Sequence, residues 1–172
     1  TWWNRTGPMR PLHVVNDLRL GHVLEQIAQR FRRPVGALHG LRIADIGCGA
    51  GLMCEPLAAR GAQVVGVDAA ANNIAAARLH ANTCGLQIDY RVGEPDAALH
   101  DGESFDVVLL LEVVEHVDDV PAFVRGAVAH LAPGGLLVAN IHAQPWSTLG
   151  LWRRTRHRLG RPHCQCSPSA ES

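Results

Sequence analysis

The chain has 172 residues, 47% of them hydrophobic, and 16 basic residues balance 16 acidic ones. This length suits one domain with a sizeable core, and the balanced charge gives no reason to expect a nucleic-acid partner. No apolar run approaches the roughly 20 residues that a membrane-spanning helix needs. The chain begins with Thr1 and shows no signal-peptide pattern, so we expect an interior piece of a cytoplasmic protein.

Segments with helical and strand patterns alternate along the chain. Residues 18–31 have apolar side chains at helical spacing and predict an amphipathic helix. The predicted strands are 41–46, 62–68, 86–92, 105–112 and 136–141, and the predicted helices between them are 51–61, 70–85 and 120–131. An acidic loop is expected at 93–104 and a turn at 132–135. The alternation predicts an α/β fold, Rossmann-like and doubly wound, with a mostly parallel sheet.

Three glycines, Gly47, Gly49 and Gly51, follow the first predicted strand. Glycine lets a backbone turn sharply and approach a ligand closely, and the helix that follows offers unpaired N–H groups. Asp68 stands about 20 residues further on, at the end of the second strand, where a carboxylate can accept the ribose hydroxyls of an adenosine. Because doubly wound sheets bind ligands at the carboxyl ends of their strands, the pattern predicts a nucleoside site.

The spacing of these glycines bears on which nucleoside is bound. A dinucleotide fingerprint reads G-x-G-x-x-G, with the pyrophosphate at the helix N-terminus, whereas this run reads G-x-G-x-G and is preceded by Asp45. A carboxylate suits a ligand with cationic groups better than a pyrophosphate. S-adenosylmethionine, which carries a sulfonium and an ammonium, is therefore favoured over NAD. In the alternative interpretation the glycines serve only helix–strand packing.

The segments "DIGCGAG", "VVGVDAA", "FDVVLLLEVVEHV" and "LAPGGLL" resemble the motifs of class I S-adenosylmethionine-dependent methyltransferases. Within that class, residues 1–142 are most similar to the ubiquinone-biosynthesis O-methyltransferases. Three segments carry this closer resemblance: the Trp2-Trp3 pair, "PLHVVNDLRLGHV" at 11–23 and "ARLHANTCGLQIDYRV" at 77–92.

The resemblance implies a role in cofactor binding for six residues. These are Arg19 for the methionine carboxylate, Gly47 and Gly49 for the turn, Asp68 for the ribose, Asp96 for the adenine, and Leu111 beside the cofactor. An arginine on a helix is otherwise expected to be exposed, which is the alternative for Arg19.

The segment "LEVVEHV" is expected to carry the reaction. Glu112, Glu115 and His116 stand at i, i+3 and i+4, a spacing that places three side chains on one side of a helical turn. Two carboxylates and an imidazole can bind a divalent cation, and the resemblance implies a site for Mg²⁺. His116 is also a candidate general base for a phenolic proton. Alternatively, the two glutamates are solvated at the end of a strand and His116 is a cap.

The resemblance implies an O-methyltransferase of ubiquinone biosynthesis that methylates a hydroxyl of a polyprenylated catechol or demethylubiquinol. It also implies peripheral contact with the inner membrane and a place in a ubiquinone-biosynthesis complex. Two other interpretations stay open: a class I methyltransferase with another small-molecule acceptor, and a non-catalytic nucleoside-binding remnant.

We expect two parts in the chain, a cofactor-binding methyltransferase domain over 1–145 and a disordered, arginine-rich tail over 146–172. The tail resembles nothing in the family, whose sheet continues with further strands, so the fold is expected to be incomplete at its C-terminus. His163, Cys164 and Cys166 in this tail are too few to indicate a metal site.

Overall fold

The structure is a computed structural model that describes Trp3, Thr6 and residues 10–140. The predicted tail over 146–172 lies outside the described residues. The elements are α1 (Arg10–Phe31), β1 (Arg42–Ile46), α2 (Cys54–Ala58), β2 (Gln63–Asp68), α3 (Ala71–Thr83), β3 (Asp89–Val92), α4 (Pro95–Ala98), β4 (Phe105–Leu111), the 3₁₀ helix η1 (Val114–His116), α5 (Val120–Ala129) and β5 (Leu131–Asn140).

The five strands form one sheet in the order β3-β2-β1-β4-β5, and every neighbouring pair is parallel. The predicted α/β fold with a parallel sheet is confirmed. The chain first moves outward from β1 through β2 to β3 and then returns to place β4 on the other side of β1. The strand order therefore reverses between β1 and β4, and parallel sheets of this kind bind ligands beyond the carboxyl ends of the strands at that reversal.

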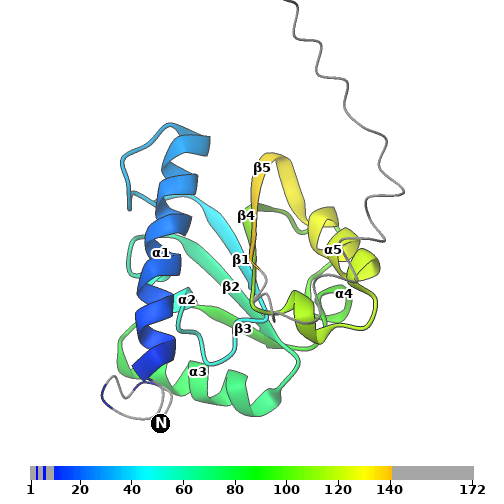
Figure 1. The fold of residues 1–172 in the computed structure, drawn as a ribbon, viewed down its shortest axis with the longest axis horizontal. Helices are drawn as coiled ribbons and strands as arrows, with labels where there is room; N and C mark the ends of the chain where they lie inside the picture. The colour runs from blue at the N-terminus through cyan, green and yellow to red at the C-terminus, as the bar shows by residue number, and fades with distance from the viewer. Residues whose placement is uncertain (1–2, 4–5, 7–9, 141–172) are drawn as a thin grey trace, which may run out of the picture. The chain divides into compact units, whose positions relative to one another are not determined.

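Helices cover both faces of the sheet, as Figure 1 shows: α1, α2 and α3 lie on one side, and α4 and α5 on the other. The strand β4, which lies between β1 and β5, contributes to both layers because its side chains alternate between the faces. Val107 and Leu109 join the core beneath α1, α2 and α3, whereas Val108 and Leu110 join the core beneath α4 and α5, and all four are fully buried. Burial on both faces explains the unbroken apolar sequence of this strand.

The first helix is longer than its sequence pattern predicts, because it begins at Arg10 rather than at residue 18. Val14 and Val15 in the additional part of α1 are exposed, so that part lacks the continuous apolar face from which a helix is recognised. Among the described residues, no helix combines the length and apolar character needed to cross a membrane.

The acidic loop and the predicted turn also differ in detail. The loop over 93–104 contains the short helix α4, which begins at Pro95, a residue suited to a first helical turn. The predicted turn at 132–135 interrupts the pairing of β5 with β4. Phe105 of β4 pairs with Leu131, but the next paired residue of β4, Val107, lies opposite Leu136, so residues 132–135 are left out of the ladder.

Candidate functional site

The glycine-rich turn after β1 needs glycine for both conformation and space. Gly47 and Gly51 have φ angles of +80° and +84°, which disfavour other residues. A Cβ atom on Gly47 would lie 2.6 Å from the Cβ of Val113, and one on Gly51 would collide with the Tyr90 hydroxyl. The backbone N–H of Gly47 donates to the carbonyl of Val67 at the end of β2, at 2.7 Å. The turn is therefore held against the carboxyl ends of β1 and β2.

Asp68, the last residue of β2, braces this turn. Its Oδ2 accepts a hydrogen bond from the Gly49 N–H at 2.9 Å, and its Oδ1 accepts from the Ala70 N–H at 2.8 Å and from Asn73 Nδ2 at 3.2 Å. A carboxylate offers about four acceptor positions, so these bonds leave room for a further donor. The carboxylate thus has a structural role that the sequence did not indicate, and its ribose role stays a prediction.

Two neighbouring cavities open at this edge of the sheet. One, of about 200 Å³, is lined by Arg19, Asp45 and Leu111, and the other, of about 270 Å³, by Asp68 and His116 among others. Gly47 and Glu112 line both cavities, and Gly49 lines the first of them. The structure therefore brings the predicted Arg19, Gly47, Gly49, Asp68 and Leu111 to one end of the sheet.

Arg19 reaches the smaller cavity from α1. Its Nη2 lies 2.7 Å from Glu112 Oε1, and the side chains of the two residues are 16% and 29% exposed. Arg19 is thus not an ordinary exposed helix arginine. A guanidinium has five N–H donors, so this ion pair leaves others to bind a second carboxylate.

Asp45 is the buried acid of the smaller cavity. The residue is 2% exposed, and the thiol of Cys54 donates to its Oδ2 at 3.2 Å. The pKa of Asp45 is raised to about 6, mainly by burial and to a smaller extent by the nearby Asp68, against the opposing effect of the Cys54 hydrogen bond. A cationic ligand group placed here would stabilise the ionised form.

The metal site predicted from Glu112, Glu115 and His116 is not assembled in the structure. Glu112 has a φ of +58° and η1 is a single 3₁₀ turn, so the three residues do not share a face of one helix. Glu112 instead pairs with Arg19, and Glu115 and His116 are exposed. Within the described part of the chain, these three form no cluster whose ligand atoms all lie within 4.8 Å of one another. The three residues therefore do not share the expected helical face, and their role as Mg²⁺ ligands stays a prediction.

His116, at the end of η1, is the predicted base, and it lines the cavity that contains Asp68. Asp96 is placed differently from its prediction. It does not line that cavity, and its carboxylate lies so close to Gly126 of α5 that a Cβ there would collide with it. Asp96 instead lines an adjacent cavity of about 360 Å³ together with Glu94, Pro95 and His116, which line both cavities, so its contact with adenine stays a prediction.

Sequence reasoning missed Asn16. It lies on α1 one turn before Arg19, lines the same cavity and donates from Nδ2 to the Leu52 carbonyl at 3.0 Å. The i, i+3 spacing from Arg19 is the signal that could have identified it.

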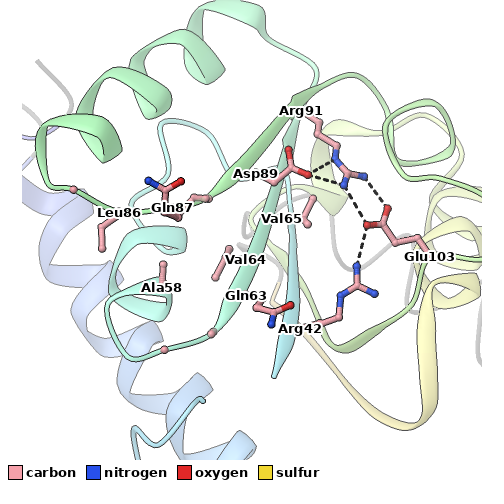
Figure 2. A pocket seen from close by; sticks show the side chains of 14 residues that line it. Arg42, Ala58, Gln63, Val64, Val65, Leu86, Gln87, Asp89, Arg91 and Glu103 are labelled. Atoms are coloured by element: carbon pink, nitrogen blue, oxygen red, sulfur yellow. Dashed lines mark hydrogen bonds and ion pairs between the residues drawn. The ribbon is translucent and has the colours of Figure 1, made fainter. Parts of the chain in front are cut away.

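A larger cavity, of about 690 Å³, lies at the opposite end of the strands (Figure 2). Its lining includes Arg42, Gln63 and Asp89, the first residues of β1, β2 and β3. Glu103 accepts hydrogen bonds here from Arg91 at 2.7 Å and from Arg42 at 3.0 Å, and Arg91 also pairs with Asp89 (Figure 2). These bonds hold the pKa of Glu103 down to about 2. Because its charges already pair with one another, we assign this region a structural role.

Comparison with known proteins agrees with the geometry. The model of a family described as "Methyltransferase domain" matches residues 44–139. The chain is 48% identical over 153 residues to the ubiquinone biosynthesis O-methyltransferase of Bradyrhizobium diazoefficiens, covering 87% of this chain and 60% of that protein. It therefore spans less than two thirds of the length of this relative.

Solved structures show the same fold. The PH0226 protein from Pyrococcus horikoshii OT3 is 18% identical, with a TM-score of 0.62 over 91% of this chain and 65% of that one. CalS10, an amino pentose methyltransferase from Micromonospora echinaspora solved with S-adenosylmethionine, is 28% identical, with a TM-score of 0.61 over 74% of this chain and 51% of that one. The chain belongs to the methyltransferase-domain family.

Proposed function

We propose that the two cavities at the carboxyl edge of the sheet bind S-adenosylmethionine and that the protein transfers its methyl group to a phenolic oxygen. The observation that carries the proposal is the convergence of Arg19, Asp45 and Asp68 on this edge. One guanidinium and two carboxylates match a ligand that has a carboxylate, cationic groups and ribose hydroxyls. The bound state of CalS10 supports the same choice of cofactor.

Each end of the ligand has its own partner in this arrangement. Arg19 donates to the methionine carboxylate by charge-assisted hydrogen bonds, and Asp45 faces the ammonium group from the same cavity. Asp68 accepts from the ribose in the neighbouring cavity. Leu111 adds apolar contact beside the methionine part. A dinucleotide would instead require a partner for its pyrophosphate, and Asp45 would repel that group.

When bound, S-adenosylmethionine supplies an electrophilic methyl group on its sulfonium sulfur. Held by Arg19, Asp45 and Asp68, it would give this methyl group to the acceptor oxygen, with the carbon–sulfur bond broken and S-adenosylhomocysteine as the leaving product. A phenol resembles tyrosine, whose pKa is about 10, so its proton must be removed near neutral pH. His116 is the side chain we propose to accept this proton. We route no step through a metal ion, because the ligand atoms of Glu112, Glu115 and His116 do not lie together in this structure.

The acceptor is proposed from the relatives, which are named ubiquinone biosynthesis O-methyltransferases. We infer a polyprenylated catechol or demethylubiquinol as the substrate. Because a polyprenyl chain partitions into lipid, we propose that the protein works on the cytoplasmic side of the inner membrane through peripheral contact, within a ubiquinone-biosynthesis complex.

Calorimetry and a methyl-transfer assay test the proposal. S-adenosylhomocysteine should bind with 1:1 stoichiometry and NAD⁺ should not bind. Labelled methyl from S-adenosylmethionine should reach a demethylated quinol with a short prenyl chain, and transfer to the same catechol without its prenyl chain should be slower.

His116→Gln should reduce the rate by about 100-fold or more at unchanged affinity for S-adenosylhomocysteine. Binding of NAD⁺ in place of S-adenosylhomocysteine would overturn the cofactor assignment, and exclusive methylation of unprenylated acceptors would overturn the substrate.

A further inference from the structure

Three side chains of metal-ligand type meet between α2 and α3. They are Glu55 of α2, His80 of α3, and Cys84, which directly follows α3. His80 Nδ1 lies 2.8 Å from Glu55 Oε1 and 3.6 Å from Cys84 Sγ. One ligand atom from each residue lies within 4.8 Å of both others, and no other group of three His, Cys, Asp or Glu side chains in the described residues does so.

We propose that Glu55, His80 and Cys84 form a binding site for a first-row divalent metal ion, with Zn²⁺ as the ion their chemistry fits best. Zn²⁺ binds imidazole nitrogen, thiolate sulfur and carboxylate oxygen, whereas Mg²⁺ prefers oxygen ligands and retains water. A carboxylate and a thiolate together neutralise the charge of a divalent ion. This compensation matters because Glu55 is buried, at 7% exposure, and a buried carboxylate needs a counter-charge.

The spacing of the ligand atoms suits tetrahedral coordination. Bond lengths of about 2.0 Å for Zn–N and 2.3 Å for Zn–S place the two ligand atoms about 3.5 Å apart, close to the separation of His80 and Cys84. These two residues stand at i and i+4, and the Cys84 N–H donates to the His80 carbonyl at 3.0 Å, so the helical pattern extends to the cysteine. The hydrogen bond between His80 and Glu55, at 2.8 Å, would lengthen by about 0.5 Å to reach the separation of two ligand atoms on one ion.

Trp3 holds the imidazole in place for such an ion. Its ring stacks on the His80 ring with the centroids 3.7 Å apart and the planes within 4°. A metal binds in the plane of an imidazole, at the nitrogen, so a ring stacked on the face does not block it. Because Cys84 is exposed, an ion can enter from solvent and keep water as its fourth ligand.

An ion at this site would join α2 to α3. Glu55 also follows Cys54, whose thiol contacts Asp45 in the smaller cofactor cavity. Metal binding is therefore expected to stabilise the part of the fold that supports that cavity. The proposal does not depend on methyl transfer, and its readouts are metal binding and thermal stability.

The test is a titration of the reduced protein with Zn²⁺, and with Co²⁺ as a spectroscopic substitute. Cys164→Ser and Cys166→Ser are introduced first, so that the cysteines outside the described residues do not compete. We expect 1:1 binding, a thiolate-to-Co²⁺ charge-transfer band, and visible bands of tetrahedral Co²⁺. Saturating Zn²⁺ should raise the melting temperature by about 4 °C or more.

Three variants and one control decide the ligand set. Cys84→Ser should abolish the charge-transfer band, and His80→Phe, which keeps an aromatic ring for Trp3 to stack on, should weaken Zn²⁺ binding at least tenfold. Glu55→Gln should weaken it by a similar factor. His100→Phe, at an exposed histidine elsewhere, should bind as the parent does.

Absence of saturable binding, a Co²⁺ complex without the thiolate band, or undiminished affinity in Cys84→Ser would each overturn the proposal. Cys84 is exposed, so its substitution removes no core contact and keeps the test decisive even where His80→Phe or Glu55→Gln fails to fold.

Discussion

Arg19 Nη2 lies 2.7 Å from Glu112 Oε1, which connects α1 to the residue that follows β4. Both residues line the smaller cavity at the carboxyl edge of the sheet. The pair therefore fixes the guanidinium at the place where the carboxylate of the cofactor is proposed to bind. It also assigns Glu112 to the wall of this cavity, where sequence reasoning had expected a metal ligand.

Replacing Arg19 should selectively weaken binding of ligands that carry the amino-acid group. Charge-assisted hydrogen bonds contribute about 1.5–3 kcal/mol, so Arg19→Ala should reduce the affinity for S-adenosylhomocysteine at least tenfold. Methylthioadenosine, which lacks the amino acid, should bind Arg19→Ala and the parent protein equally well in calorimetry. An equal loss for both ligands would contradict the assigned role.

Replacing Asp68 should weaken binding of both ligands, because each has the ribose. Asp68→Ala removes the proposed ribose acceptor and also the bonds to the Gly49 and Ala70 N–H groups. We expect at least tenfold weaker binding of S-adenosylhomocysteine and of methylthioadenosine, together with a lower urea midpoint. Asp68→Asn retains one acceptor oxygen, so it should lose less affinity for both ligands and should have a smaller decrease of the urea midpoint. Unchanged affinity in Asp68→Ala would place the ribose elsewhere.

The backbone of Glu112 is strained, and relief of this strain should raise the free energy of unfolding. Its φ of +58° is unfavourable for any residue except glycine, and its N–H donates to Asn140 Oδ1 at 2.9 Å. Glu112→Gly and Glu112→Ala both lose the ion pair with Arg19, so their difference reports on the backbone alone. Glu112→Gly should be more stable than Glu112→Ala by about 1 kcal/mol in urea unfolding. Equal stabilities would show that the strain is absent.

Cofactor affinity should depend on pH through Asp45. Its pKa is about 6 in the folded protein against an ordinary value of 3.8, so the carboxyl is neutral below pH 6 and cannot attract an ammonium group. Binding of S-adenosylhomocysteine should therefore weaken about tenfold between pH 7 and pH 5, because one protonation step governs the change. Asp45→Asn should remove this dependence. A pH profile of the same steepness in Asp45→Asn would assign it to another group.

The ion network around Glu103 should stabilise the fold against acid. The pKa of Glu103 is lowered from 4.5 to about 2, so its contribution is complete above pH 4.5 and is lost as the pH falls toward 2. Glu103→Gln should be less stable than the parent by about 1–2 kcal/mol at pH 7. This loss is smaller than a fully buried network would give, because Asp89 and Arg42 are partly exposed and solvent screens their charges. The difference should shrink by pH 3 in urea unfolding. A constant difference across this range would assign the effect to packing.

The sequence predicted the features that depend on local pattern. The order of strands and helices followed from apolar periodicity, because the faces of a helix or strand are set by its own repeat. The glycine turn and Asp68 at the end of β2 were predicted for the same kind of reason, since parallel strands bring their carboxyl ends to one edge of the sheet. The beginning of α1 was missed because two of its apolar side chains, Val14 and Val15, face solvent.

Tertiary structure decided which side chains meet. The pairing of Arg19 with Glu112, the packing of Asp96 against α5 and the cluster of Glu55 with His80 all join segments that are distant in the chain. The expected helical face of Glu112, Glu115 and His116 failed because Glu112 adopts a left-handed conformation as it leaves β4. Local spacing cannot predict such a conformation, since the ion pair and the Asn140 hydrogen bond that hold Glu112 come from α1 and β5.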